Sequence, residues 1–492
     1  MSPLYSVAEI RDIEQRASAQ LAPGTLMHRA GQAASAAALE MLHDDSLPVL
    51  VLAGPGNNGG DALEVAANLA DGGIDVLVIH LAAPGAVSDE TARALARARS
   101  GSARFIDALP ADQEFSLVLD GLFGIGLARA LEGTARELVL AVNALGRPVL
   151  ALDVPSGLDA DCGALVGPDG VAIEATCTVT FIGDKPGLHT YAGRDCAGEV
   201  LVASLGIDAA LMPRAGAQLN DPELFRSQLK RRRHSSHKGS FGDVAIVGGA
   251  AGMAGAAVLA ARSALFAGAG RVFVAAIDAG SSFDSQQPEI MFREAADFNG
   301  SASTLVIGPG MGDSARAIKL LVKALDGSSP LVIDADALNL IGASPDLQAR
   351  LANREAPAVL TPHPLEAARL LGVTAGVVQG ERLAAARELA ARFGKIVVLK
   401  GSGSVIADPA GMAVVNTTGN PGLATGGTGD VLAGLCGSLV AQGWPAWEAA
   451  LGAVWMHGAA ADRLVDQGAG PAGLTAGELP VAIRAVLNKL IA

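Results

Sequence analysis

A glycine- and threonine-rich stretch that ends in an aspartate carries the clearest chemistry in the sequence. Residues 416–430 read NTTGNPGLATGGTGD, and the chain turns apolar directly after Asp430. Glycines and an Asn-Pro pair do not continue a helix, so a helix is predicted to begin within 426–429. The free amides at its start would bind phosphate. Asp430 suits a base that takes a proton from a hydroxyl group about to meet a phosphoryl group. The alternative is a glycine-rich turn with Asp430 as a cap.

A second glycine-rich loop, GPGNNGGDALEVA at 54–66, follows an apolar run. It lacks the Lys-Ser/Thr pair of a Walker loop, and no acidic residue stands at the end of the next strand as in a dinucleotide fingerprint. Asn57, Asn58 and Asp61 put polar side chains where that fingerprint has small residues. The loop therefore suits a phosphate or ribose with added side-chain contacts.

Two further apolar runs end in polar residues, Asp120 in the first case and Asp153 with Ser156 in the second. The carboxyl ends of parallel strands border one crevice, so these groups could converge with the 54–66 loop. Asn58, Asp120 and Ser156 offer only oxygen ligands, which suit a hard cation and not zinc. Asp153 would remain for proton transfer. The alternative is that each residue merely caps a strand or helix.

The second half carries further candidate residues at the ends of apolar runs. His363 stands between two prolines ahead of a predicted helix, which presents it rigidly. Lys400 opens KGSGSVIADPAG, a loop suited to adenine or phosphate contact. Two more turns, GGAAGMAGA at 248–256 and IGPGMG at 307–312, would expose backbone amides. Asp334 and Asp336 either order metal-bound water or cap the next helix.

The candidate residues above follow apolar runs in the sequence. These runs predict parallel sheets with helices on both faces. The expected strands lie at 47–54, 74–81, 115–122, 147–155, 176–183 and 198–205, and then at 241–249, 270–277, 303–310, 330–336, 356–363 and 394–403. Helical patterns at 61–72 and 89–100 separate them. We expect two α/β domains that meet near 215–235. The basic run KRRRHSSHKGS at 230–240 is interpreted as a solvated linker, with phosphate binding as the alternative.

Composition narrows the class of protein. The 492 residues carry a net charge of −14, which argues against nucleic-acid binding and against anionic membranes. Four cysteines without a CxxC pair indicate a reducing, cytoplasmic location and no zinc site. The N-terminus is charged and unlike a signal peptide, and glycines interrupt the uncharged run 244–261. We therefore expect a soluble protein.

With these motifs assembled, the chain resembles the bifunctional NAD(P)H-hydrate repair enzymes over nearly its whole length. NNGGD, DVPSG, TPHP and NPGLATGGTGD occur in this order, and together they are highly specific. The resemblance implies a Rossmann-like three-layer α/β/α epimerase domain at 1–217 and a linker at 218–235. It also implies a ribokinase-like, ADP-dependent dehydratase domain at 236–492.

The resemblance implies that the first domain interconverts the R and S epimers of NADHX and NADPHX, which are hydrated at C6 of the nicotinamide ring. Asp153 would transfer the proton, and Asn58, Asp120 and Ser156 would bind K⁺. The implied substrate residues are Asn57, Asn58, Gly59, Gly60, Asp61, Gly124, Ile125, Gly126, Leu127, Ala128, Arg129, Ala130 and Asp153. The family loop is expected to read GGDG where this chain has Ala62, a change that adds one methyl group.

For the second domain, the resemblance implies that the S epimer accepts the β-phosphoryl group of ADP and then eliminates phosphate. Asp430 would be the base, Mg²⁺ would accompany the phosphates, and the protein would be a homo-oligomer. The implied nucleotide residues are Lys400, Gly401, Ser402, Gly403, Ser404 and Gly429. The implied residues for the hydrated dinucleotide are Ala256, Gly312, His363 and Asp430.

Two alternatives remain open from the sequence. The later motifs fit a ribokinase-like small-molecule kinase, of the hydroxymethylpyrimidine or thiazole type, equally well. The NNGGD domain could also be a non-catalytic module that binds a ligand or a protein.

Overall fold

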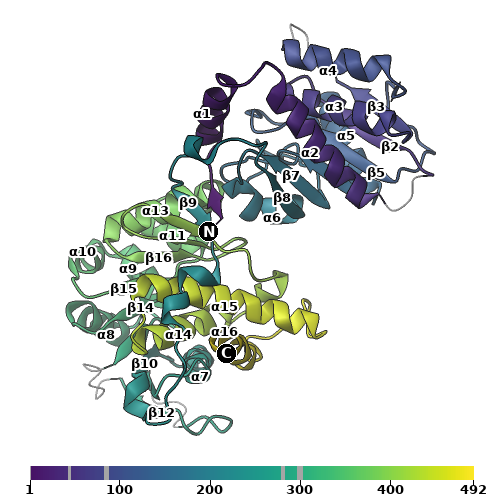
Figure 1. Cartoon of the computed structure of the whole chain (residues 1–492). Coiled ribbons are helices and arrows are strands. Elements are labelled where there is room, and N and C mark those ends of the chain that lie inside the picture. Colours follow the sequence, from purple (N-terminus) through teal and green to yellow (C-terminus); the bar gives the residue numbers. More distant parts are fainter. Residues whose placement is uncertain (1, 43–45, 82–87, 279–282, 296–302) are drawn as a thin grey trace. The chain divides into compact units, whose positions relative to one another are not determined.

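The computed structural model describes residues 2–42, 46–81, 88–278, 283–295 and 303–492. The chain forms two compact units, a first unit at Ser2–Ala217 and a second unit at Gln218–Ala492 (Figure 1). Each unit has its own β-sheet and its own hydrophobic core. The predicted α/β class is confirmed for both. None of the helices in the described residues combines the length and hydropathy needed to cross a bilayer.

The first unit contains a seven-stranded sheet in the order β4-β3-β2-β5-β6-β7-β8, with every pair parallel. Its strands are β2 (Val49–Ala53), β3 (Val76–His80), β4 (Arg104–Phe105), β5 (Leu117–Gly121), β6 (Val149–Leu152), β7 (Cys177–Phe181) and β8 (Glu199–Ala203). All of β2, β5, β6 and β7 is buried, as the continuous apolar runs predicted.

Helices cover both faces of this sheet (Figure 1). Alternate residues of β2 enter two different cores: Val49 and Val51 pack with α2 and α3, whereas Leu50 and Leu52 pack with α5. The helices are α1 (Val7–Ser18), α2 (Thr25–Met41), α3 (Asn57–Asp71), α4 (Asp89–Ser100), α5 (Gly133–Ala144) and the short α6 (Gly193–Cys196).

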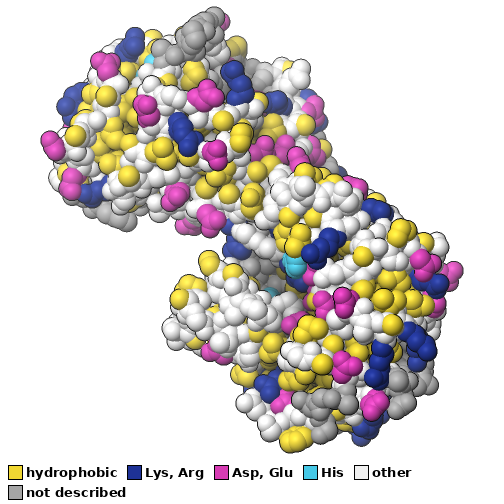
Figure 2. Space-filling view, turned by 180° about the vertical axis from the view of Figure 1, so that it is seen from behind, with side chains coloured by type: hydrophobic (Ala, Val, Ile, Leu, Met, Phe, Trp, Pro, Cys, Tyr) yellow, Lys and Arg dark blue, Asp and Glu magenta, His cyan; other side chains and the backbone are white. Residues whose placement is uncertain are grey.

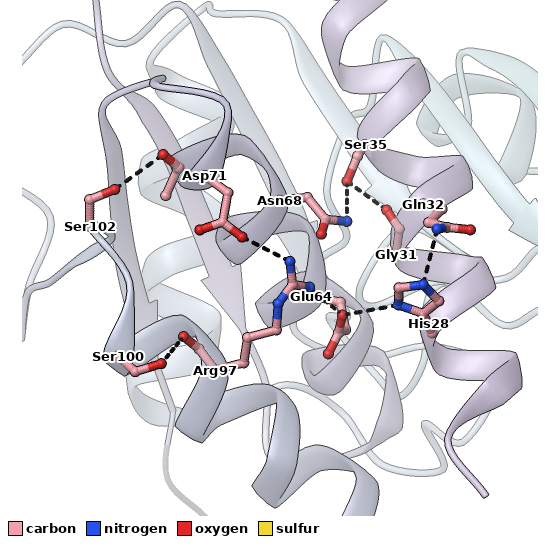
Figure 3. A network of polar contacts seen from close by, with 11 residues as sticks. His28, Gly31, Gln32, Ser35, Glu64, Asn68, Asp71, Arg97, Ser100 and Ser102 are labelled. Atoms are coloured by element: carbon pink, nitrogen blue, oxygen red, sulfur yellow. Dashed lines mark hydrogen bonds and ion pairs between the residues drawn. The ribbon is translucent and has the colours of Figure 1, made fainter. Parts of the chain in front are cut away.

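Polar contacts brace α3 between α2 and α4 (Figure 3). Arg97 of α4 binds Glu64 at 2.7 Å and Asp71 at 3.0 Å, both on α3. On the other side, Asn68 of α3 donates to the hydroxyl of Ser35 on α2 at 3.0 Å. The NNGGD motif forms the start of α3. The contacts that hold α3 therefore also hold this motif in place at the edge of the sheet.

The second unit contains a sheet in which β10, β11, β12, β13, β14, β15 and β16 are parallel, whereas β17 is antiparallel to both β16 and β18. The order is β9-β18-β17-β16-β15-β14-β13-β10-β11-β12. The strands are β9 (Ala217–Leu219), β10 (Asp243–Gly248), β11 (Arg271–Ala276), β12 (Met291–Glu294), β13 (Thr304–Ile307), β14 (Leu331–Ile333), β15 (Ala358–Leu360), β16 (Ile396–Leu399), β17 (Val405–Ala407) and β18 (Ala413–Val415).

One face of this sheet packs on α7 (Ala254–Phe266), α14 (Thr428–Ala441), α15 (Ala446–Asp466) and α16 (Leu479–Ile491), which share one core with alternate strand residues. Phe225, within the segment 218–235, is fully buried in that core, and its ring lies 6.1 Å from that of Trp444. The remaining helices are α8 (Ala315–Asp326), α9 (Ala335–Ala343), α10 (Pro345–Asn353), α11 (Pro364–Leu371), α12 (Ala375–Gly380) and α13 (Arg382–Phe393).

Candidate active sites

The first unit has a cavity of about 430 Å³ next to the carboxyl ends of its central strands. The predicted residues that line it are Asn57, Asn58, Asp61, Gly124, Ile125, Gly126, Leu127 and Asp153. Gly59 and Gly60 are buried in α3, and Ala128, Arg129 and Ala130 do not belong to the lining. Helix α1 adds Ile10, Arg11 and Glu14, which the sequence did not single out.

A fully buried lysine holds Asp153 in this cavity. Lys185 Nζ donates to Asp153 Oδ1 at 2.6 Å, to Thr180 Oγ1 at 2.7 Å and to the Phe181 carbonyl at 2.9 Å. The Ile125 amide donates to the second oxygen, Asp153 Oδ2, at 3.3 Å. Asp153 itself has φ of +65°, a left-handed conformation that costs energy for a non-glycine residue. The chain thus accepts strain to place this carboxylate at the cavity wall.

Asp61 lies in the same cavity as Asp153, and its surroundings favour the protonated form. Burial, followed by the negative charge of Asp153, raises the pKa of Asp61 well above its ordinary value. Burial and then Asp153 also raise the pKa of Glu14. One lysine-bound carboxylate therefore stands near carboxyl groups that favour the protonated form, an arrangement suited to general acid–base chemistry.

Of the three predicted cation ligands, Asn58 lines this cavity, and Ser156 Oγ accepts at 2.8 Å from the amide of Phe123, which also lines it. Asp120 is fully buried, accepts from Ser156 Oγ at 2.7 Å and from the Ser156 amide at 2.8 Å, and burial raises its pKa to about 6. Within the described residues, the buried side-chain amide of Asn58 has no hydrogen-bond partner at either atom. A Cβ on Gly124 would lie 2.9 Å from Asp153 Oδ2 and 3.3 Å from Asn58 Cγ, so only glycine permits this approach. The unpartnered buried amide oxygen of Asn58 is a suitable ligand for a hard monovalent cation.

In the second unit, Asp430 lies in the first turn of α14, as predicted. Gly427 caps this helix with φ of +93°, which leaves the following amides exposed to a ligand. Burial, and then the negative charge of Asp334, raises the pKa of Asp430 to about 7, while the positive charge of Lys400 opposes the shift. A carboxylate with this pKa is matched to general-base work near neutral pH.

The ends of β14 and β16 meet the start of α14 at this point. Lys400 Nζ binds Asp334 Oδ1 at 2.5 Å, and a Cβ on Gly429 would lie only 3.3 Å from the same Nζ. Asp334 does not cap α9 with its side chain, because its carboxylate faces the lysine. Asp336 accepts from the Gly312 amide at 2.8 Å and so fixes the 307–312 turn.

His363 stands directly before α11, as predicted, and its side chain caps this helix, which was not predicted. Its Nδ1 accepts from the Leu365 amide at 3.1 Å, and its own amide donates to Glu366 Oε2 at 2.8 Å. Burial, followed by the charge of Lys400, lowers the pKa of His363, so the neutral imidazole is favoured. Burial raises the pKa of Glu366 to about 7.

A buried arginine fixes the 400–404 loop. Arg382 of α13 is fully buried, and its guanidinium donates to the carbonyls of Leu399, Lys400 and Gly403, each at 3.3 Å. Inside the loop, the Gly401 amide donates to Ser404 Oγ at 3.2 Å. Lys400, the first residue of this loop, also lies beside Gly429 at the start of α14. The loop and the start of α14 therefore border the same region.

Comparisons with known proteins agree with this two-site layout. A family model described as YjeF-related protein N-terminus matches residues 23–187, and one described as NAD(P)H-hydrate dehydratase matches residues 244–482. The bifunctional NAD(P)H-hydrate repair enzyme Nnr of Coxiella burnetii is 37% identical over 99% of this chain and 100% of its own length. That of Escherichia coli is 37% identical over 94% of this chain and 89% of its own.

The chain belongs to the family of bifunctional NAD(P)H-hydrate repair enzymes. A solved ribokinase-like superfamily protein from Enterococcus faecalis is 27% identical, covers 56% of this chain and 98% of its own, and has a TM-score of 0.50. The small-molecule kinase alternative accounts only for the second unit, whereas the similarity to these repair enzymes extends over both. It is therefore not favoured.

The sequence did not single out three buried groups of this repair enzyme: Lys185, Glu366 and Arg382. Lys185 lies 32 residues after Asp153, and Arg382 lies 17 to 21 residues before the three carbonyls that it binds, so no local spacing joins them. One signal was present: Lys185 stands in GDKPG, directly after the apolar run 176–183. A lone lysine at a strand end is a candidate to bind a carboxylate at a neighbouring strand end.

Proposed function

We propose that this repair enzyme epimerises NADHX and NADPHX in the domain at 1–217 and dehydrates the S epimers with ADP in the domain at 236–492. The observation that carries the proposal is that one chain holds two separate carboxylate clusters, each beside the glycine-rich start of a helix. The full-length similarity to bifunctional repair enzymes supports the same division.

In the epimerase, Asp153 would take the proton of the C6 hydroxyl group while Asp61 supplies a proton to the ring nitrogen. Carbon C6 bears both a hydroxyl group and a bond to nitrogen, so this double transfer breaks the C–N bond and leaves an aldehyde and an amine. Closure on the opposite face returns both protons and gives the other epimer. Lys185 would hold the Asp153 carboxylate in position through its contact with Oδ1. The residues at 57–61 and 124–130 would bind the dinucleotide.

Potassium would bind at Asn58, Asp120 and Ser156, because these oxygen atoms and the unpartnered Asn58 amide suit a hard cation. It would supply positive charge that keeps Asp120 ionised at neutral pH.

In the dehydratase, Asp430 would take the proton of the C6 hydroxyl group as that oxygen attacks the β-phosphoryl group of ADP. AMP leaves, and the phosphate ester then loses inorganic phosphate from C6 and a proton from C5, which restores the dihydronicotinamide. The Gly427–Gly429 amides would stabilise the negative charge on the phosphoryl group. Residues 400–404 and Gly429 would bind the nucleotide, and Ala256, Gly312 and His363 the hydrated dinucleotide. Mg²⁺ would enter as part of the ADP complex, because no cluster of three or more His, Cys, Asp or Glu occurs among the described residues.

Two further proposals concern the whole protein. All four cysteines are free thiols, which supports a reducing cytoplasm. A homo-oligomer is supported by the family resemblance. Its mass in solution, measured by light scattering after size-exclusion chromatography, would test it.

The test follows absorbance at 340 nm on a mixture of R and S NADPHX with ADP and magnesium. The intact enzyme should recover all of the NADPH faster than spontaneous epimerisation allows. Asp153→Asn should recover only the S fraction rapidly, and Asp430→Asn should recover neither. Asp326→Asn, an exposed carboxylate on α8, is the matched control and should behave as the intact enzyme. Recovery of both epimers by Asp153→Asn would overturn the epimerase assignment.

A further inference from the structure

The second unit has another cavity, of about 910 Å³, away from the candidate dehydratase site. It lies at the amino ends of β10 and β11, because Phe241 and Gly268 line it and directly precede these strands. The residues of the dehydratase site instead follow the carboxyl ends of β13, β14 and β16. The two sites therefore lie at opposite edges of one sheet. The cavity at the amino edge is called the amino-edge cavity below.

Five cationic side chains line the amino-edge cavity: Lys230, Arg231, Arg232, Arg233 and Arg484. Among the described residues that line it, Glu289 is the only acidic side chain. Within the described residues, none of the five cations forms an ion pair with an aspartate or glutamate. Acidic and basic side chains are interspersed on the faces seen in Figure 2, and the chain carries a net charge of −14. The cavity is therefore locally positive in a chain whose net charge is negative.

Two of the five cationic side chains, Arg231 and Arg232, have a structural task, and the other three do not. Arg232 lies 3.7 Å over the Phe241 ring and donates to the Gly268 carbonyl at 2.5 Å, which closes the end of α7. Arg231 donates to the Ala492 carbonyl. In the described part of the chain, the side chains of Lys230 and Arg233 have no hydrogen-bond acceptor. Arg484 has only a ring contact, 4.9 Å from Phe266.

The walls between these cations are apolar and aromatic. Phe241, Phe266 and Trp444 all line the amino-edge cavity, together with leucine side chains of α7, α14 and α16. Planar guanidinium groups bind phosphate through paired hydrogen bonds, whereas rings and leucines bind a flat organic group. A cavity of this volume holds a ligand the size of a nucleotide.

We propose that the amino-edge cavity binds an organic phosphate of nucleotide size, with its phosphates on Lys230, Arg233 and Arg484 and its ring against the aromatic wall. The basic run at 230–240 is then part of a ligand site and not only a solvated linker. Free nucleotides and inorganic polyphosphate share this phosphate chemistry, so the experiment uses both.

The experiment titrates tripolyphosphate, and separately ATP, into the intact chain by calorimetry. The double charge reversal Arg233→Glu/Arg484→Glu should lose one class of site, with affinity for both ligands reduced about tenfold or more. Lys319→Glu is the matched control, because Lys319 is an exposed cation on α8 far from the cavity lining, and it should bind as the intact chain. Arg233→Lys/Arg484→Lys should retain part of the affinity. ATP binding stronger than tripolyphosphate binding would place the ring on the aromatic wall.

Three results would overturn the proposal. The first is equal phosphate affinity in the intact chain and the Glu/Glu variant. The second is an equal loss in Lys319→Glu, which would be a general effect of charge. The third is a Glu/Glu variant whose oligomeric state changes while its stoichiometry of phosphate binding does not, which would assign these cations to a subunit contact. Unfolding temperature verifies that the variants fold, and the binding readout stands whether or not the proposed repair activity is correct.

Discussion

At the scale of single residues, we expect the proposed epimerase to depend most on Lys185 after Asp153. Its ammonium is fully buried and binds Asp153, so Lys185→Met would leave that carboxylate without its cation. We expect epimerisation to fall about a hundredfold or more. Thr180→Val removes a different partner of the same Nζ and keeps the charge, so its effect should be much smaller. Conversion of R to S NADPHX measures both, and dehydration of the pure S epimer should remain unchanged. An epimerase rate in Lys185→Met equal to that in Thr180→Val would contradict the role.

The pKa of Asp430 predicts the pH dependence of dehydration. This carboxyl must be ionised to act as a base, and its pKa is raised to about 7, so kcat/KM should fall as pH decreases through about 7. Asp334 raises that pKa, and its removal would also leave the Lys400 charge unpaired. Both changes favour ionised Asp430, so Asp334→Asn should move the inflection to lower pH. Rates across pH 5 to 9 would show the shift, and an inflection that stays in place would count against Asp430 as the base.

Asp120 predicts a stabilisation by potassium that depends on pH. Burial raises the pKa of Asp120 from the ordinary value of 3.8 to about 6. The free energy of unfolding therefore decreases as pH rises from 3.8 through 6, because the folded protein must then bury an ionised carboxylate. A bound cation favours the ionised form. At a potassium concentration tenfold above Kd we expect about 1.4 kcal/mol, or roughly 3–5 °C in Tm. Calorimetry in KCl against tetramethylammonium chloride should show this at pH 7.5 and less at pH 5. Asp120→Asn should reduce the difference, and a potassium effect equal at both pH values would refute the site.

At the scale of elements, apolar runs predicted most of the parallel strands, but not the parallel β4 and β12 or the short antiparallel β17 and β18. The run at 394–403 predicted β16, whereas β17 and β18 are apolar but only three residues each, too short to show a strand pattern. The start of α14 and the position of His363 before α11 were predicted because glycine and proline act locally. The partners of Lys185 and Arg382 could not be predicted, because the topology that joins them is not encoded in their spacing.

Arg382 shows how a buried side chain of one element sets the shape of another. Its guanidinium holds three carbonyls around the 400–404 loop, and a lysine presents one point charge in place of that fork. Arg382→Lys should therefore raise the KM for ADP about tenfold, since the loop amides lose their fixed positions. Arg387→Lys, on the same helix α13, is the matched control and should leave KM unchanged. Dehydration rates over a range of ADP concentrations would separate KM from kcat. A fall in kcat alone, with KM unaltered, would show that Arg382 does not act through the nucleotide loop.

At the scale of the whole molecule, the two units have separate sheets and cores, so each site should work when the other is inactive. A mixture of Asp153→Asn and Asp430→Asn chains contains one working epimerase and one working dehydratase on different chains. We expect it to recover NADPH from both epimers, because an epimer released by one unit can bind the other from solution. At equal concentrations of working sites, the rate should match that of the intact enzyme. A mixture that recovers the R fraction much more slowly than the intact chain would show that the epimer normally reaches the dehydratase without equilibrating with solution. The same chains, each assayed alone, provide the control, since neither should rapidly convert the R epimer to NADPH.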